Sequence, residues 1–226
     1  MKNFVKTGPM KLPSRIARGT FDLYLFEFIE NKYFTLEKGD IMSEENPLVR
    51  IESNCVWAHI FGSARCDCGE QLHESMKKII EEGSGLLIQA YNQDGRGLSL
   101  RDHVRVYMEQ DKGYDTVEAD RRCGFENPDR RDYSEIIQIL GEYKINKCRL
   151  LTNNPHRISI LEKHGIEITR VPLEAVIIDK YNAAQLYTKK TKLDHDFSFD
   201  TSDPEIIDIF INSVKKDSFS EYEEDL

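Results

Sequence analysis

Three of the chain's five cysteines fall within one short stretch, which we call the cysteine segment (residues 55–68), and they restrict the fold more than any other feature. A catalytic zinc ion commonly has three protein ligands and keeps a fourth position for water or substrate, whereas a structural zinc ion has four ligands. The thiols of Cys55, Cys66 and Cys68 fit the catalytic arrangement. They equally fit a simpler interpretation, in which Cys55 is a core residue, the other two lie in a turn, and His59 or His73 completes any structural site.

The composition indicates a folded globular protein. A hydrophobic content of 39% in 226 residues is enough for a sizeable core. The formal net charge of −9 argues against a nucleic-acid partner bound through a general basic surface. No apolar run approaches the length of a membrane span, and the first 14 residues lack the apolar region of a signal peptide. We therefore expect a cytoplasmic protein that binds neither nucleic acid nor membrane.

Arginines are concentrated in the middle of the chain. Their number in one stretch indicates a local site for an anionic ligand inside an acidic protein. For any single arginine, pairing with one of the abundant Asp and Glu residues explains its presence better. The residues concerned are Arg96, Arg101, Arg105, Arg121, Arg122, Arg130 and Arg131.

Alternating apolar residues predict an antiparallel opening of the fold. After a flexible basic lead to Ser14, residues 20–29 and 33–36 alternate about a polar turn, which is typical of a β-hairpin. Residues 47–55 form a further strand that delivers the first thiol. After Gly69 the period becomes helical, and Gly83 is placed to end that helix.

Helices and strands alternate through the rest of the chain. We expect strands at 85–90, 148–151 and 166–171, and helices at 134–143, 155–163, 183–190 and from 203 to 214. Leu100, Val104, Tyr107 and Met108 mark another helix by their spacing. Residues 113–132 show no period, and we expect a functional loop there. The prediction is a mixed α/β fold with one catalytic domain over residues 1–197, followed by a C-terminal helix and acidic tail over 198–226.

Six blocks of sequence, in this order, closely resemble GTP cyclohydrolase II, the enzyme that opens the purine of GTP at the first step of riboflavin synthesis. They are residues 55–71, 93–96, 113–119, 129–133, 150–155 and 170–173. The resemblance runs from about Gly19 to about Asp194. It implies a single-domain α/β zinc enzyme that works as a homodimer and needs Mg²⁺ for the triphosphate. The implied products are formate, diphosphate and a diaminopyrimidinone ribosylamino phosphate.

The resemblance also implies roles for individual residues. Cys55, Cys66 and Cys68 become the zinc ligands, and zinc with an open position activates water. Asp129 falls on the proposed proton acceptor, Arg131 on the proposed nucleophile at the α-phosphate, and Tyr107 near the metal. The residue type itself supports phosphate stabilisation by Arg131, because a guanidinium is almost always protonated. The nucleotide contacts implied are Arg50, Asn54, Gln71, Asp94, Gly95, Arg96, Thr116, Thr152 and Arg157.

Several of these positions have structural explanations as well. Thr116 suits a turn, Thr152 a helix cap, and Arg157 a solvated helix position. The helical spacing of Tyr107 with Val104 and Met108 favours a core role.

Departures from the family pattern bear on base preference. The family usually has His and Glu where this chain has Glu52 and Asn54, Glu at Asp94 and Lys at Arg157. A carboxylate can accept two hydrogen bonds from guanine, which an Asn or a displaced Asp cannot copy. The alternatives are therefore a divergent cyclohydrolase that acts on another purine nucleotide or stops at the formamidopyrimidine, and a non-catalytic nucleotide-binding protein with structural zinc.

Overall fold

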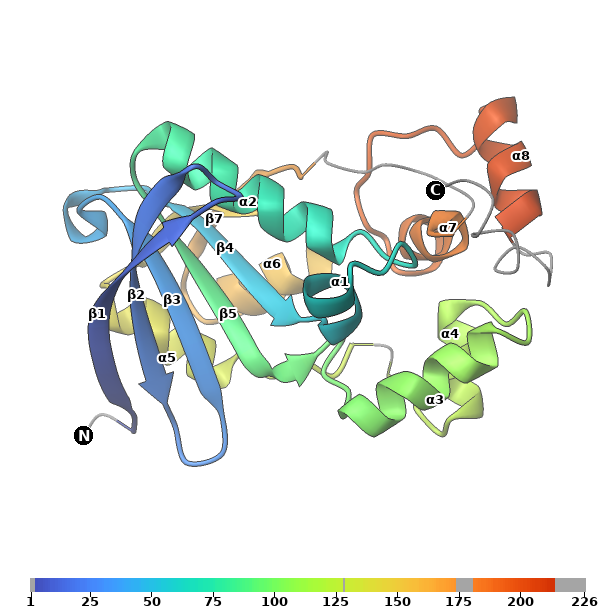
Figure 1. The fold of residues 1–226 in the computed structure, drawn as a ribbon, viewed down its shortest axis with the longest axis horizontal. Coiled ribbons are helices and arrows are strands. Elements are labelled where there is room, and N and C mark those ends of the chain that lie inside the picture. The colour runs from blue at the N-terminus through green and yellow to red at the C-terminus, as the bar shows by residue number, and fades with distance from the viewer. Residues whose placement is uncertain (1–2, 128, 174–180, 214–226) are drawn as a thin grey trace.

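A mixed seven-stranded sheet forms the centre of the protein, whose computed structural model describes residues 3–127, 129–173 and 181–213 (Figure 1). The spatial order of the strands is β1-β2-β3-β5-β4-β6-β7. The acidic tail expected after residue 213 lies outside the described residues. The strands are β1 (Val5–Ser14), β2 (Gly19–Glu27), β3 (Lys32–Lys38), β4 (Leu48–Asn54), β5 (Gly85–Asp94), β6 (Lys147–Leu151) and β7 (Glu167–Val171).

The sheet has an antiparallel half and a parallel half. β1, β2, β3 and β5 pair antiparallel, and this confirms the hairpin predicted from residues 20–36. β5, β4, β6 and β7 run parallel to one another. The carboxyl ends of these four strands therefore meet at one edge, where α/β proteins commonly bind ligands. The predicted mixed α/β class is confirmed.

Helices cover both faces of the sheet. One core cluster contains Ile136, Ile139 and Leu140 of α5 (Ser134–Glu142) and Leu161 of α6 (Pro155–Lys163), which pack on Val49, Ile51 and Ile88 of the strands. The opposite face packs Met76 and Ile79 of α2 (Cys68–Glu82) on Leu48 and Leu87. Because successive strand residues point to opposite faces, β4 and β5 contribute side chains to both clusters.

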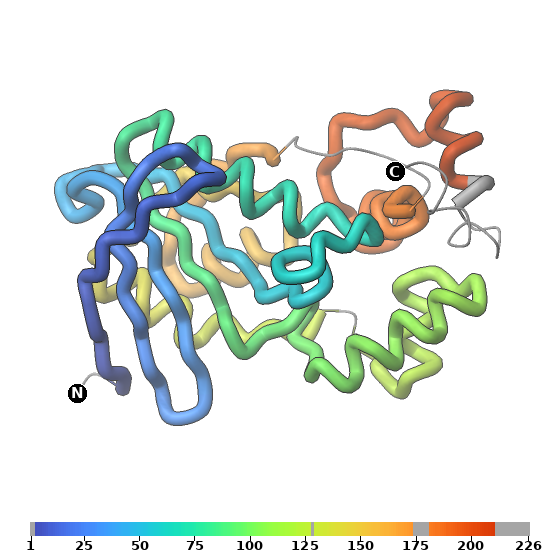
Figure 2. The backbone as a smooth tube through the Cα atoms, viewed as in Figure 1, coloured from blue at the N-terminus to red at the C-terminus, as the bar shows by residue number. Residues whose placement is uncertain are grey.

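The remaining α-helices lie beyond the carboxyl ends of β4 and β5. Figures 1 and 2 show α3 (Leu100–Gln110) and α4 (Thr116–Arg122) on one side of this edge, with α7 (Ala183–Lys192) and α8 (Pro204–Ser213) on the other. The short α1 (Val56–Phe61) follows β4 directly, and a 3-10 turn (Ile41–Ser43) precedes β4. None of the helices in the described ranges has the length and apolar character needed to cross a membrane.

The expected flexible lead is wrong, because residues 5–14 form the edge strand β1. This strand pairs with β2 from Val5 opposite Glu27 to Ser14 opposite Gly19. Most of its side chains are exposed, so there is no apolar alternation for the sequence to show. The strand is held by its backbone hydrogen bonds to a neighbour and not by a buried face of its own.

The expected loop over residues 113–132 is also wrong in part, because it contains α4. The Asp115 side chain accepts hydrogen bonds from the backbone of Val117 and Glu118, and Glu118 completes a capping box. That box was readable in the sequence, but seven residues are too few to show a helical period. At α6 the cap prediction is confirmed, since Asn154 caps a helix whose first residue is Pro155.

The helix predicted at residues 100–108 is present as α3, but its apolar stripe faces outward. Leu100, Val104 and Met108 are 53%, 44% and 55% exposed. The inward residues are His103 and Val106. A spacing of four gives three apolar residues one face but does not say what that face contacts.

The two predicted C-terminal helices are confirmed as α7 and α8. They pack together through Tyr187 and Phe210, whose ring centroids lie 4.7 Å apart. The division of the chain at residue 197 stays a prediction.

The central position of Ile88 predicts a large effect on stability. Its side chain is fully buried on β5, and truncation to Ala leaves a cavity between β4 and the helices behind it. We expect Ile88→Ala to lower the free energy of unfolding by about 2–5 kcal/mol, measured by urea denaturation. Ile29→Ala, at a residue that is 98% exposed, should change it by less than about 0.5 kcal/mol. Equal effects of the two substitutions would contradict the core described above.

Candidate active site

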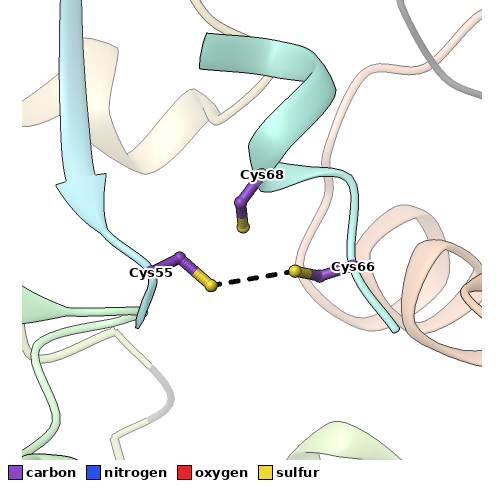
Figure 3. Close-up of side chains that lie close together, drawn as sticks. All are labelled: Cys55, Cys66 and Cys68. Atoms are coloured by element: carbon purple, nitrogen blue, oxygen red, sulfur yellow. Dashed lines mark hydrogen bonds between the residues drawn. The ribbon is translucent and has the colours of Figure 1, made fainter. Parts of the chain in front are cut away.

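The three cysteines of the cysteine segment converge on one point (Figure 3). Cys55 directly follows β4, Cys66 lies in the loop before α2, and Cys68 is the first residue of that helix. Their sulfur atoms all lie within 4.8 Å of one another, and those of Cys55 and Cys66 are 3.7 Å apart. Tetrahedral zinc with bonds of about 2.3 Å sets its sulfur ligands about 3.8 Å apart, so the geometry fits this ion.

The electrostatics of the cluster also favour a cation. The hydrogen bond with Cys55, together with burial, raises the pKa of the Cys66 thiol to about 12. Neighbouring thiolates repel one another in a buried site, whereas a bound divalent cation stabilises them and releases their protons. The free thiols are thus poor acids that a metal converts into good ligands.

The metal-ligating group contains three residues among those described, because no fourth Cys, His, Asp or Glu atom joins it. His59 accepts a hydrogen bond at Nδ1 from the backbone N–H of Cys55, at 3.3 Å. His73 is exposed on α2. The geometry therefore favours the open three-ligand arrangement over a closed structural site completed by either histidine.

A cavity opens beside the cysteines at the carboxyl ends of β4, β5 and β6. Its walls come from every layer of the fold and from the helices beyond the sheet. Most residues that the sequence singled out line it, namely Arg50, Cys55, Cys66, Cys68, Gln71, Gly95, Arg96, Tyr107, Thr116, Arg131, Thr152 and Arg157.

A chain of buried polar contacts runs along one wall. The Arg50 guanidinium donates to the Glu52 carboxylate at 2.9 Å and 2.5 Å and to Gln71 Oε1 at 3.0 Å. Gln71 Nε2 in turn donates to Asp67 at 2.5 Å, and Lys189 of α7 forms an ion pair with the same carboxylate at 2.5 Å. Asp67 lies between two of the cysteines, so this network connects β4, α2 and α7 at the cysteine segment.

Asp129 and Arg131 form a bidentate ion pair. Arg131 Nε donates to Asp129 Oδ1 at 2.8 Å, and its terminal nitrogen donates to Oδ2. Burial alone would raise the pKa of Asp129, but the hydrogen bonds and charge of Arg131 outweigh it and hold that pKa well below its usual range. Arg131 lines the cavity, whereas Asp129 lies behind it and also accepts from Asn154. Asp129 therefore fixes the orientation of a guanidinium that faces the cavity.

Two further arginines line the cavity, of which Arg157 is buried and Arg96 is partly buried. Arg157 is 4% exposed at the N-terminal turn of α6. Arg96 forms an ion pair with Asp120 of α4 at 2.6 Å. Gly97 has a φ of +83°, and an added Cβ would lie 2.7 Å from the backbone of Arg130, so glycine allows residues 130–131 to approach β5 closely. Of the clustered central arginines, Arg96 and Arg131 line the cavity, whereas Arg105 and Arg122 form exposed pairs with Asp102 and Glu109.

A family model described as GTP cyclohydrolase II matches residues 6–172, which include the cysteine segment and most of the cavity wall. The chain belongs to the GTP cyclohydrolase II family. This assignment confirms the family recognised in the sequence and places the chain among hydrolases. The match begins within β1, earlier than the sequence blocks indicated, and ends before α7.

Curated relatives agree with the family. Riboflavin biosynthesis protein RibBA of Endomicrobium trichonymphae is 43% identical over 187 residues, which are 81% of this chain and 45% of the relative. The protein of that name from Cytophaga hutchinsonii is 43% identical over 78% of this chain and 44% of its own length. The one from Chlamydia trachomatis is 37% identical over 84% of this chain and 45% of its own length. This chain thus spans less than half the length of these relatives. The solved structure of RibBX, a two-domain 3,4-dihydroxy-2-butanone 4-phosphate synthase from A. baumannii, resembles this chain only weakly. The TM-score is 0.39 and the sequence identity 12%, over 67% of this chain and 35% of that one.

Tyr107 of this GTP cyclohydrolase II family member lies beside the cysteines. Burial, followed by the nearby thiols of the cluster, raises the pKa of its hydroxyl well above the usual value. Its ring packs edge-on against His103 at a centroid distance of 4.9 Å. The expected core role shared with Val104 and Met108 is wrong, because those two residues face outward while Tyr107 lines the cavity.

Two predicted nucleotide contacts lie behind the cavity wall. The Asn54 amide donates to the backbone carbonyl of Tyr91 at 3.1 Å. The Asp94 carboxylate accepts from the backbone of Val56 at 3.2 Å and pairs with His103 at 2.5 Å. Glu52 also departs from the family pattern, and this acidic residue does line the cavity.

Sequence reasoning missed the residues that α7 and the chain after it contribute. Gln185, Lys189, Leu193 and His195 all line the cavity. The helix itself was predicted, but nothing in its period indicated which face meets the cysteine segment. His103 and Asn153 also line the cavity and were not singled out.

The Asp129–Arg131 pair predicts a pH-dependent contribution to stability. Because the pKa of Asp129 is lowered in the folded state, the pair stabilises the protein above the unfolded pKa of about 3.9 and ceases to do so as pH falls toward the folded value. We expect Asp129→Asn to cost roughly 1–3 kcal/mol near neutral pH, since it leaves Arg131 without its charged partner. Urea unfolding should show this difference shrinking below about pH 4.

The exposed pair between Lys147 and Glu167 provides the matched control. Glu167→Gln removes a carboxylate from a pair that is 35% and 67% exposed, and we expect no measurable change. A difference between wild type and Asp129→Asn that stays constant down to about pH 3 would contradict the coupling.

Proposed function

We propose that the chain is a zinc-dependent GTP cyclohydrolase II that opens the imidazole ring of GTP, releases formate and diphosphate, and leaves a diaminopyrimidinone ribosylamino phosphate for riboflavin synthesis. The carrying observation is a three-thiol set that faces a cavity whose walls contain Arg96, Arg131 and Arg157. Hydrolysis of a nucleotide's base requires a metal that activates water. It also requires cationic groups that bind the phosphates.

Cys55, Cys66 and Cys68 are proposed to hold the zinc ion. A zinc ion held by these three thiols would supply Lewis-acid chemistry, namely activation of water and polarisation of a carbonyl group. The hydrogen bond with Cys55 and the charge of Lys189 lower the pKa of the Cys68 thiol, but the hydrogen bond with Cys66 and burial outweigh them, so this pKa is raised well above its usual value. Lys189 adds a positive charge beside three ligands that bind as anions. We propose that Mg²⁺ arrives with the triphosphate, because this ion commonly binds through phosphates and keeps several waters.

Arg131 and Arg157 are proposed to bind the phosphates. The Arg131 guanidinium stays protonated, since burial lowers its pKa but the nearby Tyr133 and the paired Asp129 carboxylate outweigh burial and raise it. A protonated planar guanidinium held from behind is a good clamp for phosphate oxygens. The arginine nucleophile that the family resemblance implies would have to give up a proton, and Asp129 lies in position to accept it.

A second candidate is the same ring opening on another purine nucleotide. Glu52 favours it, because this buried carboxylate stands in the cavity wall at a position where the family usually has His. Its hydrogen bonds occupy Arg50 and thereby change what that side of the cavity offers a base. Asn54 and Asp94, by contrast, are engaged elsewhere.

We also propose a homodimer, supported by the outward stripe of Leu100, Val104 and Met108 on α3. Neighbouring α1 adds Ile60 and Phe61, which are 69% and 71% exposed. The rings of Trp57 on α1 and Tyr107 on α3 are in contact, so the two helices are neighbours. A stripe with a repeat of four residues can pack against its own copy across a two-fold axis.

The activity test is the release of formate from GTP. We expect the purified chain with zinc and Mg²⁺ to release formate and diphosphate together. Cys66→Ser should lose both the bound zinc, measured by elemental analysis, and the formate. Cys123→Ser is the control, because Cys123 is a half-buried cysteine that packs beside α3 and α4, outside the cysteine segment. This variant should keep both its zinc and its formate release.

The products distinguish the candidates. Formate from ATP or ITP but not from GTP would overturn the GTP assignment and support the second candidate. Retention of the formyl group, seen by mass spectrometry, would indicate that the reaction stops at the formamidopyrimidine. Full zinc content and activity in Cys66→Ser would contradict the metal site itself.

The dimer test uses a charge on α3. We expect wild type to elute at about twice its 26.3 kDa chain mass by light scattering, because the apolar stripe is removed from water in the dimer. Val104→Glu should yield a folded monomer. Ile29→Glu, at a turn residue that is 98% exposed, should leave the dimer intact. A Val104→Glu protein that stays dimeric would exclude this face.

A further inference from the structure

One face of α7 closes the cavity on the side away from the sheet. Gln185, Lys189 and Leu193 follow one another at intervals of four residues, so they share a helix face, and all three line the cavity. His195, just beyond the helix, lines it too. We call these four residues the C-terminal wall. They lie beyond residue 172, where the family match ends.

The C-terminal wall is fixed to the catalytic part of the fold at three points. Lys189 pairs with Asp67 of the cysteine segment at 2.5 Å. Lys192 pairs with Asp115, the cap residue of α4. Beyond the helix, the backbone N–H of Asp196 donates to the carbonyl of Asn153 at 3.0 Å. The wall is therefore a built part of the site.

Two polar atoms of this wall are buried without a hydrogen-bond partner among the described residues. They are Gln185 Oε1 and His195 Nδ1. Buried polar atoms in proteins are almost always paired, and leaving one unpaired is unfavourable. Because both side chains line the cavity, a ligand in the cavity is the natural partner for each of them.

The chemistry of the two atoms limits what that ligand group can be. An amide oxygen accepts hydrogen bonds only, so Gln185 Oε1 needs a donor, which an ionised phosphate does not offer. Burial and the neighbouring charges of Lys189 and Arg131 lower the pKa of His195 to about 3, so its ring is neutral. A neutral imidazole adds no charge to the phosphate-binding arginines. Both residues suit hydroxyl or amino groups.

We propose that Gln185 and His195 bind the nucleoside part of the substrate, through a ribose hydroxyl or an amino group of the base. Lys189 holds α7 against the cysteine segment and so positions the pair. This inference deepens the proposed function, because it rests on a nucleotide occupying the cavity. It assigns to the chain beyond the family match a part in choosing the substrate.

The test is equilibrium binding by calorimetry, with the zinc-containing protein and with Mg²⁺ omitted. Gln185→Ala and His195→Ala should each bind GTP roughly 5- to 30-fold more weakly, the usual result of removing one buried hydrogen bond. His195→Asn keeps a polar atom near Nδ1 and should recover much of the loss. Thr191→Ala is the control, since Thr191 is exposed on the same helix and its hydroxyl donates to the Tyr187 carbonyl.

Analogues identify the group that is bound. Inorganic triphosphate should bind wild type and both Ala variants equally. 2′-Deoxy-GTP lacks a ribose hydroxyl and ITP lacks the base amino group, so wild type should bind the analogue without the recognised group more weakly than it binds GTP. In the variant that has lost the residue binding that group, GTP and this analogue should bind with nearly equal affinity. Unchanged GTP binding in both variants would overturn the inference. So would a loss that is equal for GTP and triphosphate, or equal for GTP and both analogues.

The role of the C-terminal wall and the proposed function can be disproved independently of each other. If wild type releases formate from GTP and both Ala variants bind like wild type, the C-terminal wall has no such role while the proposed function stands. If wild type releases no formate but the variants lose nucleoside affinity selectively, the proposed reaction fails and the binding assignment stands.

Discussion

The Asp67 carboxylate is the contact on which the site depends. It lies between two cysteines at the start of α2, almost fully buried, and it binds Gln71 of the same helix and Lys189 of α7. A buried carboxylate without these partners would be strongly unfavourable, so the cysteine segment and α7 are stable together in this arrangement. Through Gln71 the same network reaches Arg50 on β4. The position of the three cysteines is thereby coupled to the wall of the cavity.

The parallel half of the sheet supplies the rest of the site by geometry. β4 leads to Cys55, β5 ends at Asp94 and β6 leads to Thr152, and all three ends meet at one edge. The residues after each strand can therefore differ in chemistry while their backbones stay fixed by strand pairing. This is why thiols, guanidinium groups and hydroxyls from distant parts of the sequence face a common cavity.

The strands and helices with buried faces could be predicted from the sequence, because burial imposes a period. β2, β3 and α2 follow such periods, and α6 also carries the cap residue Asn154. β1 could not, since its side chains are mostly exposed and its partner is chosen by the sheet. α4 is too short for a period. The outward face of α3 has the pattern of a buried one, because the sequence records that a face is apolar but not what covers it.

The candidate site was accessible to sequence reasoning only where family motifs run through it. Cys55, Arg96 and Arg131 stand in such motifs, and all three line the cavity. Lys189 pairs with a residue 122 positions away, a distance over which no local pattern carries information. Asn54 and Asp94 also stand in motifs, but their side chains bind Tyr91 and His103 and do not line the cavity. Adjacency in sequence to a ligand-binding residue does not fix the direction of a side chain.

The long sequence separation between Lys189 and the cysteines has a consequence for how the protein is made. During translation the cysteine segment leaves the ribosome well before α7, and segments nearer the N-terminus generally fold first. The thiols can therefore assemble on the sheet edge while the side later covered by α7 is still open to solvent. Docking of Lys189 on Asp67 then closes that side, so assembly of the three thiols comes before closure of the cavity.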